Sequence, residues 1–69
     1  MKIHTVVENA EIKAVVWYDP THLWAMGIED AATGNLLQLE DGSSAEYLGG
    51  VGKKAAFKYA SELFAKAVA

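Results

Sequence analysis

Few residues of this chain have the type and spacing that catalysis or metal binding requires. His4 and His22 lie far apart, and no third ligand stands at a metal-binding spacing from them, so we expect no metal site. The acidic residues gather near predicted strand ends, where solvated carboxylates are common. A 69-residue chain offers little of the cleft that tunes a catalytic acid–base pair. We expect Ser43 and Ser44 to cap local structure. The sequence therefore predicts no catalytic residue, no cofactor and no enzymatic activity.

A glycine-rich segment before two lysines has some likeness to a phosphate-binding loop. Residues 49–52 read Gly-Gly-Val-Gly and precede Lys53 and Lys54. A phosphate-binding loop would have glycine at Tyr47 and serine or threonine at Lys54, so the pattern does not match. Backbone N–H groups at a helix start hold anions in other proteins, and an anion site is the minor alternative. We expect the segment to be a linker into the last helix.

Size and charge limit the classes of function. The 69 residues form one domain, 1–69, and a chain of this size buries only about 60% of its unfolded surface. The net charge is −3 and all six basic residues are lysine, which does not favour a general nucleic-acid-binding face. There is no cysteine, no apolar stretch of about 20 residues and no apolar signal-peptide region near the start. We therefore expect a cytoplasmic protein that does not enter a membrane.

Apolar alternation predicts a meander of four antiparallel strands, although the first strand beside the fourth is an alternative order. Strands are expected at residues 2–8, 11–18 and 36–40, and a third strand carries Trp24, Met26 and Ile28 and ends at Ile28-Glu29. Ser43 and Glu46 form a capping-box pattern that predicts a short helical turn over residues 44–48. An apolar stripe at helical spacing predicts a helix over residues 53–68. The predicted fold is α+β: a four-stranded antiparallel sheet covered on one face by a C-terminal helix, with a short helical turn before it.

Two turns set the predicted register. A two-residue loop at Asn9-Ala10 would pair Ile3 with Val16 and Thr5 with Ala14. A three-residue loop after Asp19 would pair Tyr18 with Trp24, Val16 with Met26 and Ala14 with Ile28, because Asp-Pro favours a turn there. This second loop sends the large side chains of the third strand into the core.

These registers place the two tryptophans on opposite faces of the sheet. Trp24 lies toward the predicted helix, and Trp17 lies on the other face, which one helix cannot cover. The predicted partner-binding surface consists of Trp17, Val15, Val6, Lys13, His4 and Lys2. An apolar centre with a charged rim is typical of protein contacts, and tryptophan is enriched among their energetic anchors. The alternatives are that Trp17 covers its neighbours, or that the register is displaced by one residue.

Three lysines at the start of the predicted helix indicate a second class of function. Lys53, Lys54 and Lys58 would form a local basic patch. Residues 52–60 resemble the last helix of double-stranded RNA-binding domains, whose first helix this chain lacks. The strand-rich start and alanine-rich helix look like antitoxins of the HicB type, without their proline-rich strand motif. These resemblances imply a nucleic-acid-binding or antitoxin-like regulatory module.

A third resemblance concerns the overall plan. Tyr18, the strand end Ile28-Glu29 and the turn glycine Gly34 fall at spacings similar to those in small phage-encoded anti-CRISPR proteins of type I systems. The resemblance implies a viral inhibitor that binds and blocks a host protein or ribonucleoprotein complex in the host cytoplasm. The negative net charge, and not the resemblance, is the reason that we expect no direct nucleic-acid binding. A homodimer through the Trp17 face or the edge strands is a further alternative.

Overall fold

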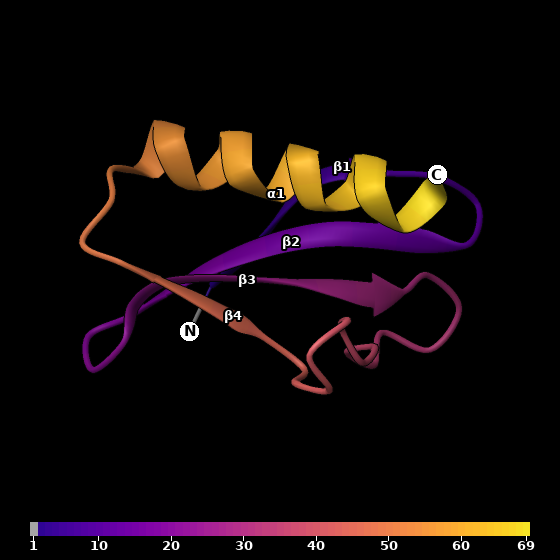
Figure 1. The fold of residues 1–69 in the computed structure, drawn as a ribbon, viewed down its shortest axis with the longest axis horizontal. Helices are drawn as coiled ribbons and strands as arrows, with labels where there is room; N and C mark the ends of the chain where they lie inside the picture. The colour runs from indigo at the N-terminus through magenta and orange to yellow at the C-terminus, as the bar shows by residue number, and fades with distance from the viewer. Residues whose placement is uncertain (1) are drawn as a thin grey trace.

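The computed structural model describes residues 2–69 and shows one helix lying across a four-stranded antiparallel sheet (Figure 1). The elements are β1 (Ile3–Glu8), β2 (Ile12–Asp19), β3 (Leu23–Asp30), β4 (Glu46–Gly49) and α1 (Lys53–Val68). The strand order is β1-β2-β3-β4, so each strand pairs with its neighbour in the chain. The α+β class, the meander and the C-terminal helix predicted from the sequence are confirmed.

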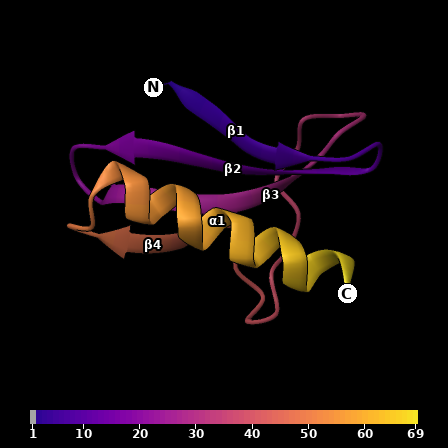
Figure 2. The same ribbon diagram turned by 90° about the horizontal axis from the view of Figure 1, so that it is seen from above.

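The helix-side core forms where α1 crosses the sheet. Ala56 and Ala60 are fully buried, and their small side chains let the helix lie close to the strands. Beneath them lie four buried strand residues, Ala14, Val16, Met26 and Ile28. Phe57, Leu63 and Phe64 are half-buried against this core. Figure 2 shows α1 running obliquely, from above β2 and β3 at its start towards the β4 side of the sheet at its end.

The β2–β3 hairpin has the predicted register. Tyr18 lies opposite Trp24, and Asp19 lies opposite Leu23, which leaves a three-residue loop. The Asp19 carboxylate accepts a hydrogen bond from the Thr21 N–H at 2.8 Å, as expected of aspartate at the start of a turn. Leu23 closes the loop with a φ of 60°, the left-handed conformation that commonly follows a three-residue hairpin loop.

The register of the β1–β2 hairpin differs from the prediction by two residues next to the turn and by one residue beyond the bulge. Ile3 lies opposite Trp17, not Val16, and Thr5 lies opposite Val15, not Ala14. The expected two-residue loop at Asn9-Ala10 is wrong.

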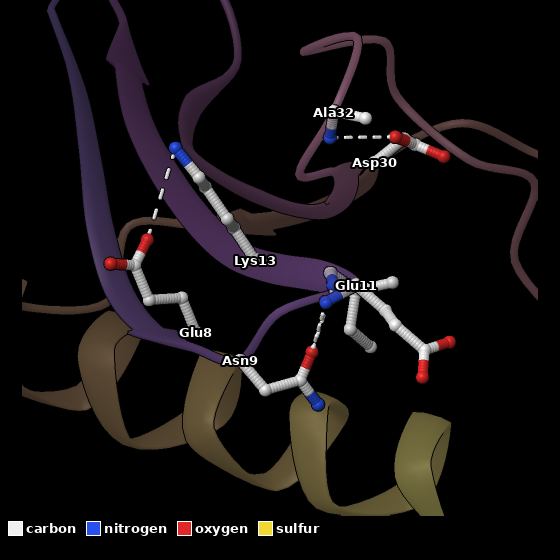
Figure 3. Close-up of polar contacts among 7 residues, drawn as sticks. Glu8, Asn9, Glu11, Lys13, Asp30 and Ala32 are labelled. Atoms are coloured by element: carbon white, nitrogen blue, oxygen red, sulfur yellow. Dashed lines mark hydrogen bonds and ion pairs between the residues drawn. The ribbon is translucent and has the colours of Figure 1, made fainter.

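The Asn9 side chain is the reason for this difference. Its Oδ1 accepts the N–H groups of Glu11 at 2.8 Å and Ile12 at 2.9 Å, which stabilises a wider turn (Figure 3). In this turn Glu8 lies opposite Lys13, with 3.8 Å between Lys13 Nζ and Glu8 Oε2. A two-residue loop would instead have placed Glu8 opposite Glu11, where the two carboxylates repel each other.

A β-bulge at Val6 compensates for the shifted register. The pairing is interrupted between Thr5 and Val7, and both Val6 and Val7 pack against the helix-side core. A bulge adds one unpaired residue, so the inward and outward alternation restarts after it. Two adjacent valines can therefore face the same core, which strict alternation does not allow.

The fourth strand lies later in the chain than predicted. Residues 36–40 form no strand, and residues 44–48, predicted as a helical turn, contain most of β4. The helical turn is wrong because Ser43 does not cap a helix: its Oγ donates to Asp41 Oδ1 at 2.6 Å and lies 3.1 Å from the Ala45 carbonyl oxygen. Leu36 still forms an isolated bridge with Glu29 on the edge of β3.

The edge of β3 is thus paired in two separate pieces. The Leu37 N–H donates to the Ile28 carbonyl at 2.7 Å near one end, and β4 pairs with Leu23 to Met26 near the other. Between them residues 38–45 leave the edge and return. This excursion, residues 38–45, forms one wall of an open groove beside α1.

Candidate functional site

The sheet face opposite α1 is covered over β2 and β3. Trp17 is 8% exposed, and Val15 and Ala25 are fully buried beside it. Figure 1 shows the connection from residue 31 to residue 45 on the side of the sheet opposite α1, and Ala45 packs against this second cluster. The expectation that Trp17 and Val15 lie on an uncovered face is therefore wrong.

Gly27 marks the place where the connection meets the sheet. A Cβ atom on Gly27 would lie 2.9 Å from Leu36 Cδ2, 3.2 Å from the Ser44 carbonyl oxygen and 3.5 Å from Trp17 Cη2. A larger residue would require Leu36 to move and would press tightly on the Ser44 backbone, whereas its contact with Trp17 would be an ordinary one. The absence of a side chain at this position lets the connection pack directly on Trp17.

The six residues of the predicted partner-binding surface do not form one surface. His4 lies on the α1 side, with its ring centroid 5.9 Å from that of Phe57, and Val6 also packs on that side. Their predicted placement beside Trp17 is wrong, because the Asn9 turn and the bulge shift the register. Lys13 lies in the ion pair with Glu8, and Lys2 is exposed just before β1.

The three lysines of the alternative site lie in the first turns of α1. Lys53 Nζ is 5.7 Å from the ring centroid of Phe57, a cation–π contact. Lys54 and Lys58 are exposed one helical turn apart and so share a face of the helix. The structure brings these two together, whereas Lys53 leans over Phe57.

An aromatic row connects this end of α1 to the sheet. The His4 ring lies between Phe57 and Trp24, with centroid distances of 5.9 and 6.4 Å. Trp24 in turn contacts Tyr18 edge-on at 5.4 Å. Tyr18 is 48% exposed, so the row ends in a partly free ring.

An open groove lies between the C-terminal half of α1 and residues 37–41. Its volume is about 440 Å³. Its apolar lining consists of Ile12, Ile28, Leu37, Leu39, Leu63 and Ala67. A second hollow of about 260 Å³ shares Glu46, Leu63 and Lys66 with the first and is also lined by Leu48 and Tyr59. Together the two hollows form a continuous surface along α1, named here the α1 groove.

The charged residues of the α1 groove are mostly acidic. Glu40, Asp41 and Glu46 line the larger hollow, Glu62 lines the smaller one, and Lys66 lines both. The groove also borders the C-terminal turns of α1, where the helix dipole places partial negative charge. The surface therefore combines an apolar floor with a negative rim.

Asp41 is held in its ionised form. Its Oδ1 accepts hydrogen bonds from Ser43, from the Oγ at 2.6 Å and from the N–H at 3.0 Å. The side-chain bond and then the backbone bond lower the pKa of Asp41 below its usual value. The rim charge at this position consequently persists below the pH at which ordinary aspartates protonate.

The other polar contacts are typical of turns. His22 Nδ1 lies 3.3 Å from Asp19 Oδ2, and the His22 ring stacks on Tyr47 at 4.5 Å. Asp30 Oδ1 accepts the Ala32 N–H at 2.8 Å in the turn after β3 (Figure 3).

Within residues 2–69, no three histidine or acidic side chains are grouped closely enough to ligate a metal. Over the same range, α1 lacks the length and apolar character of a membrane-crossing helix.

The prediction missed the α1 groove because residues 36–40 were assigned to a strand and residues 44–48 to a helical turn. Leu37 and Leu39 do pack against the helix-side core, but Leu37 lies where the chain still pairs with β3 and Leu39 lies on the excursion. The signal available was the acidic pair Glu40-Asp41 directly after these leucines.

Comparison of the chain with protein-family models, curated proteins and solved structures gives no match.

Proposed function

We propose that this chain is a non-enzymatic protein-interaction module that binds its partner through the α1 groove. One observation carries the proposal: the apolar floor of the groove opens to solvent, although its leucines also contact the core. Leu37, Leu39 and Leu63 are half-buried, so a partner side chain placed there would bury the rest of their surface. Concave surfaces with an apolar floor and a polar rim are typical of binding sites.

The kind of partner predicted from the sequence is a host protein or ribonucleoprotein complex that a viral inhibitor would block. That prediction rests on the resemblance to anti-CRISPR proteins, and the cytoplasmic location rests on composition. The α1 groove supplies a surface for such binding in place of the Trp17 face, whose exposed apolar centre the structure does not contain.

A random 12-residue peptide library displayed on phage tests the proposal. Selection on the wild-type protein is followed by binding assays with two variants, Ala67→Trp and Ala65→Trp. Both alanines are exposed on α1, but Ala67 lines the groove and Ala65 does not, so the pair is matched in chemistry and element.

Enriched peptides should bind the wild type and Ala65→Trp and lose at least about tenfold in affinity for Ala67→Trp, because the indole fills the groove. The proposal is wrong if no peptide is enriched, or if the enriched peptides bind both variants equally. Circular dichroism of both variants checks that each is folded.

Nucleic-acid binding through the start of α1 is the second candidate. The half-exposed Tyr18 at the end of the aromatic row favours it, because bases stack on such rings beside lysines. This function predicts steeply salt-dependent binding of a fluorescent single-stranded oligonucleotide that is weakened by Lys54→Glu and Lys58→Glu. Absence of binding at low salt removes this candidate.

A further inference from the structure

We infer that the α1 groove takes a basic amphipathic segment of its partner protein, with lysine or arginine side chains on both edges of an apolar face. This inference rests on the proposed function and names the chemistry of the partner. It follows from three properties of the groove: the positions of its acidic side chains, the scarcity of cations among its lining residues, and its apolar floor.

The acidic side chains lie on different elements around the floor. Glu40 and Asp41 belong to the excursion, Glu46 begins β4, and Glu62 is on α1. A segment lying along the groove therefore meets three carboxylates on the excursion and β4, and one, Glu62, on the helix wall of the smaller hollow. Basic residues at both edges of an apolar face would meet these charges, while their methylene stems cover the leucines.

Little positive charge in the groove opposes this arrangement. Lys66 is the one cation among the described residues that line it, and it lies one helical turn after Glu62 on α1, so the excess of negative charge comes from Glu40, Asp41 and Glu46. Elsewhere Lys13 is engaged by Glu8, and Lys53 lies over Phe57. The partial negative charge at the end of α1 adds to the rim. An acidic segment would meet like charges here, which disfavours it and gives specificity for a basic one.

The floor explains why an amphipathic segment is inferred and not merely a basic one. Ile12, Ile28, Leu37 and Leu39 line the larger hollow, and Leu48 and Tyr59 line the smaller one. Charge attraction between exposed groups contributes little by itself, so stable binding needs apolar side chains in these hollows. The expected segment fills them and uses its charges for orientation and specificity.

The test uses the tightest-binding peptide from the library selection, synthesised in three forms. The first keeps its basic residues, the second replaces each of them with glutamine, and the third replaces each with glutamate. Amide ¹H–¹⁵N spectra of the wild-type protein identify the residues each form contacts, and titrations give the affinities.

The selected peptide should carry at least two basic residues, and the glutamine form should bind about tenfold more weakly at low salt. That difference should shrink at about 0.5 M salt, where exposed charges are screened. The inference is overturned if the selected peptides lack basic residues, or if all three forms bind the groove equally. In either case groove binding itself, and so the proposed function, would stand. Failure to enrich any peptide would defeat both.

A pair of charge-reversal variants locates the effect. Glu46→Lys changes the groove, whereas Glu8→Lys changes the net charge equally at an exposed position opposite Lys13. Glu46→Lys should weaken the basic form at least about fivefold more than Glu8→Lys does. Equal weakening by the two variants would mean that overall charge, and not the groove, attracts the peptide, which would overturn the inference.

Discussion

Replacing Gly27 with alanine tests how the face opposite α1 is covered. The added Cβ would lie 2.9 Å from Leu36 Cδ2 and 3.2 Å from the Ser44 carbonyl oxygen. The Leu36 side chain can rotate away because its end is flexible. The Ser44 oxygen belongs to the backbone, so it moves only if the connection itself lifts from the sheet.

Two opposing effects set the size of the change. Forcing a methyl group into a packed contact costs about 1–3 kcal/mol. Alanine also restricts the unfolded chain, which stabilises the folded state by about 0.4–1 kcal/mol. Gly27 has no positive φ, so no backbone strain is added. The free energy of unfolding should therefore fall by about 1–2 kcal/mol.

Urea denaturation followed by circular dichroism measures this change, with Gly50→Ala as the control. A Cβ on Gly50 meets only an ordinary contact, 3.7 Å from Leu23 Cδ1, so that variant should be unchanged or stabilised by up to about 1 kcal/mol. Gly27→Ala should also shift tryptophan emission to longer wavelength, because the connection covers Trp17. Equal stability of the two variants, with unchanged emission, would refute the packing of residues 36–44 on this face.

Three further substitutions test other parts of the structure by the same assay. Trp17→Lys should lower the free energy of unfolding by about 3–5 kcal/mol because Trp17 is 8% exposed. A loss below about 1 kcal/mol would contradict the burial of Trp17. Gly52→Asp should stabilise by about 0.3–1 kcal/mol, since Gly52 is an extended N-cap without a capping side chain; an unchanged urea midpoint would contradict this. The Thr21 N–H and then His22 lower the pKa of Asp19 below 3.8 in the folded protein. The Asp19 carboxylate therefore stabilises the fold above pH 3.8, and this contribution is lost as the pH falls below 3.8. Asp19→Ala should accordingly destabilise at neutral pH, with a difference from wild type that shrinks below pH 3.8; a constant difference would contradict it.

The parts of the fold that the sequence predicted well are those fixed by local signals. The Asp19-Pro20 turn and the alternation beyond it determine the β2–β3 register, and the apolar stripe determines α1. The β1–β2 register was missed because it depends on the Asn9 side chain binding two backbone N–H groups and on the Val6 bulge. Neither changes the apolar pattern by which strands are recognised.

The candidate site could not be predicted because it depends on contacts between distant segments. Trp17 was expected to need a partner, since one helix covers one face of a sheet. The chain covers that face itself with the connection between β3 and β4. Gly27 leaves room for this connection, but in the sequence it looks like an ordinary strand residue. Burial by a loop carries no periodic signal, so alternation alone cannot show it.

The gap in pairing along the edge of β3, between Leu37 and β4, explains why the open apolar surface lies beside α1 and not around Trp17. Had residues 36–40 continued along β3, Leu39 would lie within the sheet and Glu40 would point along its edge. The chain instead leaves β3 after Leu37, so Leu39 and the following acids line the larger hollow with Leu63 on α1. Residues 36–45 therefore have two effects at once: they cover Trp17 on one face and form one wall of the α1 groove on the other. A substitution that lifts them from the sheet, such as Gly27→Ala, should consequently weaken peptide binding in the groove although it touches no groove residue. Unchanged peptide affinity in a destabilised Gly27→Ala protein would show that the two sides of this segment act independently.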